Sequence, residues 1–265
     1  MDNAQIREKS DLMRRNTGLT SYPVGVKFNF SDNQKAPDKA VRLMGHRYCQ
    51  ALMRARRGEH VILDAAGISC PAAAAAFGFK SLPEGLKNGK GLIGFGITKE
   101  EKTGIEMFKG MTVLRQGELK ELYLFPLDSA VLEPDIVVVE DRIENLMWIA
   151  LGYLNARGGS RIESSTAILQ ATCVDATLIP YKTQKMNLSY GCYGCRDATD
   201  IGHDESVLGF PFSDFEAISG YIEYLAEKAI LKSREKNAYA LLKRKSAEEA
   251  SGTDVFQSGA AREKH

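Results

Sequence analysis

Two cysteines three positions apart are the residues whose spacing most directly suggests chemistry in this chain. Cys192 and Cys195 enclose a tyrosine and a glycine, and Arg196 follows directly. Two thiols at this spacing can bind a metal ion, share a cluster, close a small disulfide or simply occupy a turn. The adjacent guanidinium is expected to favour the thiolate form by charge attraction. The residues by themselves leave these alternatives open.

A thioredoxin-like site would place such a pair at the N-terminus of a helix that follows a buried strand. The preceding NLSYG and the following DATD are polar, so the sequence disfavours that arrangement. A thiol–disulfide oxidoreductase using Cys192 and Cys195 is nevertheless one alternative function. It requires both thiols to be accessible to solvent.

Three further cysteines widen the set of thiols that could act together. Cys49 lies within a predicted helix, Cys70 lies in the turn SCPA before an alanine-rich helix, and Cys173 lies in ATCVDAT. Their spacing fits neither a ferredoxin motif nor a zinc ribbon, so they can meet only through the fold. The four histidines are scattered along the chain and offer little for a zinc–imidazole site. An iron–sulfur cluster is therefore the favoured inorganic cofactor.

Two other local patterns have simpler explanations than chemistry. The stretch from Gly89 to Gly94 matches G-x-G-x-x-G, but polar turns flank it where a dinucleotide site needs a strand and a helix. We interpret it as part of a flexible lid. His203 stands beside Asp204 and Glu205, which is typical of a solvated acidic loop more than of a metal site.

The charge balance and the apolar pattern exclude several classes of protein. The 265 residues carry 35 basic and 34 acidic side chains, a formal net charge of +1. No general positive field is available to hold a polyanion, so nucleic acid is not an expected partner. The N-terminal segment lacks the apolar core of a secretion signal, and no apolar run is long enough to span a bilayer. Five cysteines at low density also fit a cytoplasmic protein, with no membrane partner.

Hydrophobic periodicity predicts an α/β or α+β fold, a mixed sheet with flanking helices. Helices are expected at about residues 4–16, 42–57 and 142–157, and the segment 81–110 is expected to be a mobile excursion with one short helix. Strands are expected in PVGVKF, HVILD, KELYLFPL and DIVVVED. Residues 1–228 are predicted to form a single domain. Residues 229–265 are predicted to form a charged helical extension with a loose tail, a candidate for self-association into a homo-oligomer.

The order of elements repeats along the chain and suggests two related half-units, about residues 20–80 and 120–182. The first runs strand, helix ending RARRG, strand HVILD and the Cys70 turn. The second runs strand, helix ending LNARGG, an expected strand SRIESS and the Cys173 turn. Chance similarity of two α/β segments is the alternative.

Several segments in order resemble the DUF169 family of prokaryotic proteins, found often in archaea and anaerobic bacteria. These segments are YPVGVKF, RYCQALMRARRGE, GISCPAAAAAFGF, EPDIVVVE and SYGCYGCR, and the resemblance covers most of residues 20–228. The family pattern matches these positions: Cys49, Cys70, Cys173 and, in a Gly-Cys-x-Gly-x-Arg element, Gly191, Cys192, Gly194 and Arg196. Cys195 falls at a position where the pattern does not call for cysteine.

The resemblance implies that Cys192 belongs with Cys49, Cys70 and Cys173 rather than with Cys195. Four thiols are the number that a [4Fe–4S] cluster needs, with Cys195 spare or substituting and Arg196 beside the site. The expected function is then redox or reductive metabolism, with an electron-transfer partner or a small-molecule substrate. The alternative from another class is a non-enzymatic small-molecule or protein binding module in which the cysteines are structural.

Overall fold

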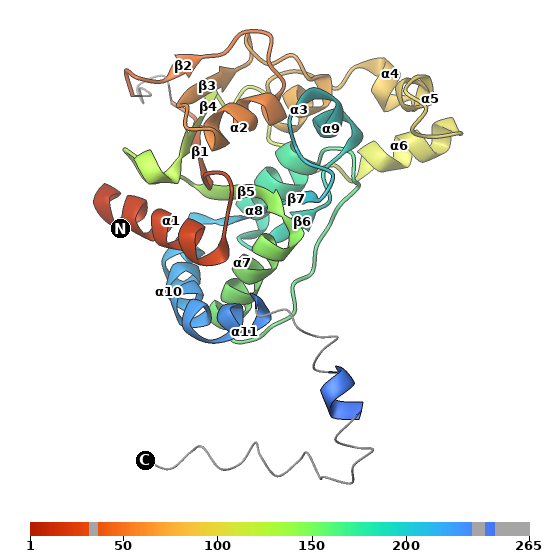
Figure 1. Ribbon diagram of the computed structural model, residues 1–265. Helices are drawn as coiled ribbons and strands as arrows, with labels where there is room; N and C mark the ends of the chain where they lie inside the picture. Colours follow the sequence, from red (N-terminus) through yellow and green to blue (C-terminus); the bar gives the residue numbers. More distant parts are fainter. Residues whose placement is uncertain (32–36, 235–241, 247–265) are drawn as a thin grey trace. The chain divides into compact units, whose positions relative to one another are not determined.

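The computed structural model describes residues 1–31, 37–234 and 242–246 of the chain (Figure 1). The chain divides into two compact units, Met1–Leu225 and Ala226–His265. The first holds a seven-stranded mixed sheet with flanking helices, and helical segments follow in the C-terminal region, so the predicted α/β class is confirmed. The predicted loose tail, from Gly252 onward, lies outside the described residues. No helix in the described parts is long and apolar enough to cross a membrane.

The sheet has the strand order β2-β3-β4-β1-β5-β7-β6. Strands β2 and β3 pair in parallel, and all the other neighbours pair antiparallel. The strands are β1 Val24–Asn29, β2 Val41–Arg42, β3 Val61–Asp64, β4 Glu121–Pro126, β5 Ile136–Arg142, β6 Asn187–Ser189 and β7 Glu205–Pro211.

Both faces of the sheet are buried, because successive side chains of its central strands enter different hydrophobic clusters. In β4, Leu122 and Leu124 join one cluster while Tyr123 and Phe125 join the other. Figure 1 shows the helices divided in the same way. The face of Leu122 is covered by α2 Tyr48–Arg56, α3 Pro71–Ala76 and η2 Ala171–Leu178, and the opposite face by α1 Asn3–Thr17, α7 Ile143–Ala156 and α10 Phe215–Leu225.

Three short helices form most of the segment predicted as a mobile excursion. They are α4 Glu84–Lys87, α5 Lys90–Gly94 and α6 Glu101–Lys109, and they lie together beyond α3 in Figure 1. Leu86, Leu92 and Phe108 give them a small buried cluster of their own. The remaining helical elements are η1 Leu127–Ser129, α8 Ile179–Thr183, α9 Tyr193–Ala198, η3 Phe212–Asp214, η4 Ala226–Ile230 and α11 Leu231–Arg234.

Two predicted elements differ in the structure. The helix expected at about 42–57 begins only at Tyr48, because Val41 and Arg42 pair with β3 instead. The expected strand SRIESS is wrong, since residues 160–165 lie in no strand, and the correspondence with HVILD fails there. The wider half-unit hypothesis stays a prediction.

A single glycine lets the helix that carries Cys173 lie directly on the sheet. A Cβ atom at Gly209 of β7 would stand 1.7 Å from the carbonyl oxygen of Ala176 in η2, so no larger residue fits. This contact between backbones brings η2 and its cysteine against the sheet. The element is a π-helix, a rare form that is frequent at functional sites.

Candidate functional site

All five cysteines line one cavity on the face of the sheet that α2, α3 and η2 cover. The cavity has a volume of about 70 Å³. Every one of the thiols is free, and all but the half-buried Cys70 are buried. The thiols come from separate parts of the chain: Cys49 from α2, Cys70 from the turn before α3, Cys173 from η2, and Cys192 and Cys195 from α9 and its N-cap. The fold therefore gathers the thiols that the sequence scatters.

Hydrogen bonds between these segments hold the walls of the cavity in place. The hydroxyl of Tyr48, next to Cys49, lies 2.8 Å from Thr177 Oγ1 in η2. The turn that leads to Cys70 is fixed by Asp64, whose Oδ1 accepts bonds from the backbone nitrogens of Ala66 at 3.0 Å and Gly67 at 2.8 Å. The cavity is thus built on packed elements rather than on a loose loop.

The Cys192–Cys195 pair lies at the start of a helix that follows a strand, contrary to the sequence-based prediction. The polar NLS forms strand β6, and Cys192 is the N-cap of α9, with its Sγ accepting from the Cys195 nitrogen at 3.4 Å. The two sulfurs are 3.1 Å apart, beyond the ~2.05 Å of a disulfide bond. Each residue is only 5% exposed, whereas a dithiol oxidoreductase needs accessible thiols.

Arg196 does not face the thiols, although the sequence suggested that its charge would act on them. Its guanidinium donates to three backbone carbonyls, those of Gly202 at 2.8 Å, Tyr190 at 2.6 Å and Glu205 at 2.9 Å. These bonds tie the start of α9 to the loop before β7. Arg196 therefore positions the Cys192–Cys195 turn by bracing the backbone on both sides of it.

Three of the thiols have raised pKa values, which disfavours the thiolate form that the sequence suggested for the pair. The hydrogen bond that Cys192 donates to Cys195, together with burial, raises the pKa of Cys192. That same bond lowers the pKa of Cys195, but a hydrogen bond with Cys49 and burial outweigh it and raise this pKa to about 12. Burial and repulsion from the neighbouring thiols raise the pKa of Cys173. Crowded, buried sulfurs resist ionisation unless a cation joins them.

The hydroxyl of Thr172 links a buried carboxyl group, that of Glu140, to the cysteine cavity. Thr172 Oγ1 lies 3.3 Å from Glu140 Oε1 and 3.2 Å from Cys195 Sγ. Glu140 is fully buried, and burial outweighs the attraction of Arg56 and raises the pKa of Glu140 to about 7. The Arg56 Nε and Glu140 Oε2 atoms stand 3.5 Å apart, and neither has a hydrogen-bond partner among the described residues.

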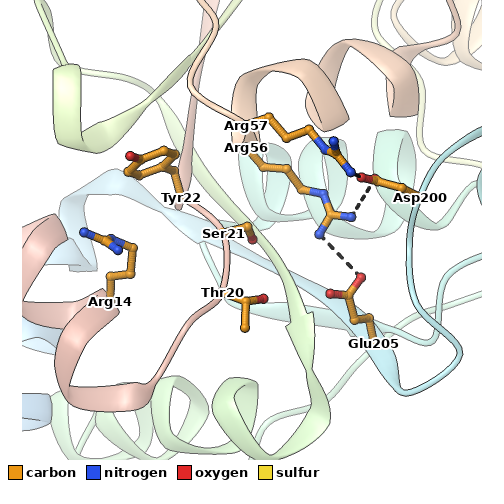
Figure 2. A pocket seen from close by; sticks show the side chains of 8 residues that line it. All are labelled: Arg14, Thr20, Ser21, Tyr22, Arg56, Arg57, Asp200 and Glu205. Atoms are coloured by element: carbon orange, nitrogen blue, oxygen red, sulfur yellow. Dashed lines mark hydrogen bonds and ion pairs between the residues drawn. The ribbon is translucent and has the colours of Figure 1, made fainter.

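Arg56 also lines a second, polar cavity of about 610 Å³, together with Arg14, Arg57, Asp200 and other side chains (Figure 2). Arg56 Nη2 donates to Asp200 at 2.7 Å, Arg57 pairs with the same carboxylate, and Arg14 pairs with Asp128 at 3.2 Å. Because carboxylates already neutralise these arginines, the cavity offers little net attraction for an anion. The polar cavity matters here because Arg56, which lines it, also forms an ion pair with the buried Glu140.

The other sequence candidates carry no site in the structure. His203 is exposed in a turn. Gly89 is the N-cap of α5 Lys90–Gly94, and α4 precedes it, so this stretch lacks the strand that a dinucleotide-binding motif needs before its glycines. Within the described ranges, no group of three or more His, Cys, Asp or Glu side chains is arranged to hold a metal ion.

Sequence reasoning missed three polar residues around the thiols. Gln170 and Thr172 line the cysteine cavity, and Glu140 lies behind Thr172. The Gln170 Nε2 atom has no hydrogen-bond partner in the described structure, although the residue is only 3% exposed. The available signal was the pattern QATC, in which polar side chains interrupt an apolar run immediately before a cysteine.

The fold and the cavity together define an α/β protein that encloses a cluster of free thiols. The sequence model of the DUF169 family, described as uncharacterised ArCR, matches residues 13–220, and the chain belongs to that family. No curated protein and no solved structure matches the chain.

Proposed function

We propose that this protein holds an iron–sulfur cluster in the cysteine cavity and acts in redox or reductive metabolism. Cys49, Cys70, Cys173 and Cys192 are the proposed ligands of a [4Fe–4S] cluster. Such a cluster, when bound, would supply one-electron transfer at a potential that the surrounding protein adjusts. The observation that carries the proposal is the convergence of all five thiols of the chain on one cavity. The described side chains are not arranged around a metal ion as they stand, so the ligand thiols would have to shift to hold the cluster.

The chemistry of the cavity suits a thiophilic cation. Thiolates are the ligands that iron–sulfur clusters use, and the thiols surround an open space of about 70 Å³. The unpartnered Nε2 of Gln170 is a buried donor at the same cavity, of the kind that hydrogen-bonds to cluster sulfurs. The raised thiol pKa values also fit, because iron would supply the positive charge that the cavity lacks.

The short contact between Cys192 and Cys195 supports four ligands rather than five. Two thiolates on one tetrahedral zinc ion would lie about 3.8 Å apart, which follows from the ~2.3 Å Zn–S distance. At 3.1 Å the Cys192 thiol donates a hydrogen bond to the Cys195 sulfur, and the proposal therefore needs only one of the two as a ligand. We assign Cys192 as the ligand and Cys195 as its hydrogen-bond partner, which Thr172 and Cys49 also contact.

The proposal includes a cytoplasmic location, because a reducing compartment keeps buried free thiols available for metal. It also includes a partner that exchanges electrons, either a protein or a small-molecule substrate. Self-association through the C-terminal extension is a further part of the hypothesis.

Oxygen-free purification followed by iron and sulfide analysis tests the proposal. The wild-type protein should be brown, with a broad visible absorption band and equal amounts of iron and sulfide. Cys70→Ser and Cys192→Ser should lose the iron, and Cys195→Ser should retain most of it. Ala51→Ser adds a buried hydroxyl to α2 two residues from Cys49 and should keep the full iron content.

Colourless, iron-free protein from this preparation would contradict the proposal. Cysteine variants that only lower the unfolding temperature would then favour the binding module with structural cysteines. The outcome for Cys195→Ser decides separately which sulfur of the pair is the ligand.

A thiol–disulfide oxidoreductase is a second candidate, favoured by the 3.1 Å approach of Cys192 and Cys195 at a helix start. Mild oxidation of metal-free protein should then link these two residues quantitatively without unfolding it. The 5% exposure of each residue is the observation against this candidate.

A further inference from the structure

A third cavity, of about 440 Å³, adjoins the cysteine cavity on the side of the three short helices. Leu86, Leu92, Phe95 and Phe108 of the α4–α6 segment form one wall, and Cys70 and Gln170 lie on the other. Its size falls within the ~300–1,000 Å³ of ligand sites, which are mostly apolar with a few polar groups. We call it the side cavity.

The side cavity and the cysteine cavity share part of their lining. The shared residues are Arg47, Cys70, Ala72, Leu169, Gln170 and Gly194. Cys70 is the half-buried thiol of the five, which agrees with its place between the two spaces. A molecule in the side cavity would therefore lie beside the thiols without entering their space.

Two donors stand at the shared wall. The Gln170 side chain is buried, and its Nε2 has no partner in the described structure. An unpaired buried donor destabilises the protein, because its lost bonds to water are not replaced, so an acceptor on a ligand would relieve that cost. Arg47 adds further N–H donors, and its Nη1 already bonds to the Gly194 carbonyl at 3.0 Å and to Asp197 at 3.5 Å, so Asp197 offsets part of its charge and Gln170 is the main donor for a ligand.

We propose that the side cavity binds a small monocarboxylic acid with an aliphatic or aromatic body. The body packs against Leu86, Leu92 and Phe108, and the carboxylate accepts hydrogen bonds from Gln170 and Arg47. Asp197 also lines the cavity and disfavours a second negative charge. Binding as such is independent of metal; only the role of this acid as a substrate beside Cys70 rests on the proposed function.

Calorimetric titration with octanoate and with octylamine tests the proposal, because the two probes share a chain and differ in the charge of the head. Octanoate should bind at least about tenfold more tightly, the effect of one charge-assisted hydrogen bond. Gln170→Leu keeps the approximate size of the side chain and should weaken octanoate binding about tenfold.

Two neighbouring residues provide a matched pair of variants, one at a position that lines the side cavity and one at a nearby surface position that does not. Phe95 lines the side cavity and is 62% exposed, whereas Ile93, two residues before it, is 38% exposed and is not among the lining residues. Phe95→Glu should weaken octanoate binding by repulsion, and Ile93→Glu should leave it unchanged.

Equal binding of the two probes, or octanoate binding that Gln170→Leu and Phe95→Glu leave unchanged, would overturn the proposal. Metal content recorded on the same samples distinguishes the two hypotheses. If the protein is iron-free but binds octanoate, only the cluster hypothesis is contradicted. If it contains iron but does not bind octanoate, only the ligand-site hypothesis is contradicted.

Discussion

The hydroxyl of Thr172 lies 3.2 Å from the sulfur of Cys195, and this contact connects the thiols to the interior charge network. On its other side the same hydroxyl meets Glu140, which faces Arg56. The chain of groups continues from Arg56 to Asp200 and Glu205 at the polar cavity. The buried Glu140 carboxyl thus lies between the charged groups of the polar cavity and the cysteine cavity. The Thr172 hydroxyl alone separates it from the Cys195 sulfur.

Glu140 should make the stability of the protein fall as pH rises. Burial raises its pKa from 4.5 to about 7, so its favourable contribution is fully present below pH 4.5, where folded and unfolded chains are both protonated. Between pH 4.5 and 7 the unfolded chain releases this proton first. The free energy of unfolding should therefore drop by about 3 kcal/mol across this window, relative to Glu140→Gln.

Urea unfolding at several pH values measures this difference between wild type and Glu140→Gln. The groups whose charge or hydrogen bonding acts on Glu140 are Arg56, Thr172, Glu205 and Arg196, and all of them are retained in the variant. Glu118→Gln, at an exposed carboxylate, is the control and should follow the wild-type curve. A difference that does not change with pH would show that Glu140 is ionised throughout.

Cys70 should be the first thiol to react in metal-free, reduced protein. It is half-buried, while the other cysteines are buried and the pKa values of Cys173, Cys192 and Cys195 are raised. Because the thiolate is the reactive form, a chromogenic disulfide reagent should label one thiol rapidly and the rest only as the protein opens. Cys70→Ser should remove the fast phase.

Cys49→Ser is the control for that experiment, since it removes a buried thiol from the same cavity and should leave the fast phase intact. Rapid reaction of two thiols together, with a Cys192–Cys195 disulfide found by mass spectrometry, would contradict the expected order. It would then support the oxidoreductase candidate.

Elements that depend on local pattern were predictable from the sequence. The predicted helix at about residues 4–16 is α1, which ends at its C-cap Gly18 with φ of +80°, and the predicted strand in PVGVKF is β1. Strand β6 was missed because its polar side chains form hydrogen bonds with residues that are distant in the sequence. The side-chain amide of Asn187 donates to the carbonyls of Ser165 at 2.9 Å and Asp175 at 2.8 Å.

The site was predictable only in part, for the same reason. Family resemblance grouped Cys49, Cys70, Cys173 and Cys192, but no spacing along the chain shows that their side chains meet. The role of Arg196 was mistaken because charge was read from sequence neighbours, whereas the guanidinium turns to backbone carbonyls. Gln170 became visible only as an unpaired donor in a folded cavity.

Gly209→Ala should destabilise the protein because it disturbs the close packing of η2 against β7. The added Cβ would lie 1.7 Å from the Ala176 carbonyl oxygen, so the helix must move away from the sheet. Overpacking of this kind costs roughly 1–3 kcal/mol, and η2 carries Cys173 with it. Urea unfolding should show the loss, and Cys173 should react faster with a thiol reagent than in wild type.

Gly220→Ala supplies the matched control for this substitution. Gly220 lies in α10 and is exposed, and a Cβ atom added there would meet no other atom within 4 Å, so alanine should stabilise the helix by about 0.5–1 kcal/mol. The two glycine variants should thus change the free energy of unfolding in opposite directions. If Gly209→Ala matched the wild type in both stability and thiol reactivity, η2 could not lie on β7 as closely as described, and the position of Cys173 in the cavity would have to be revised.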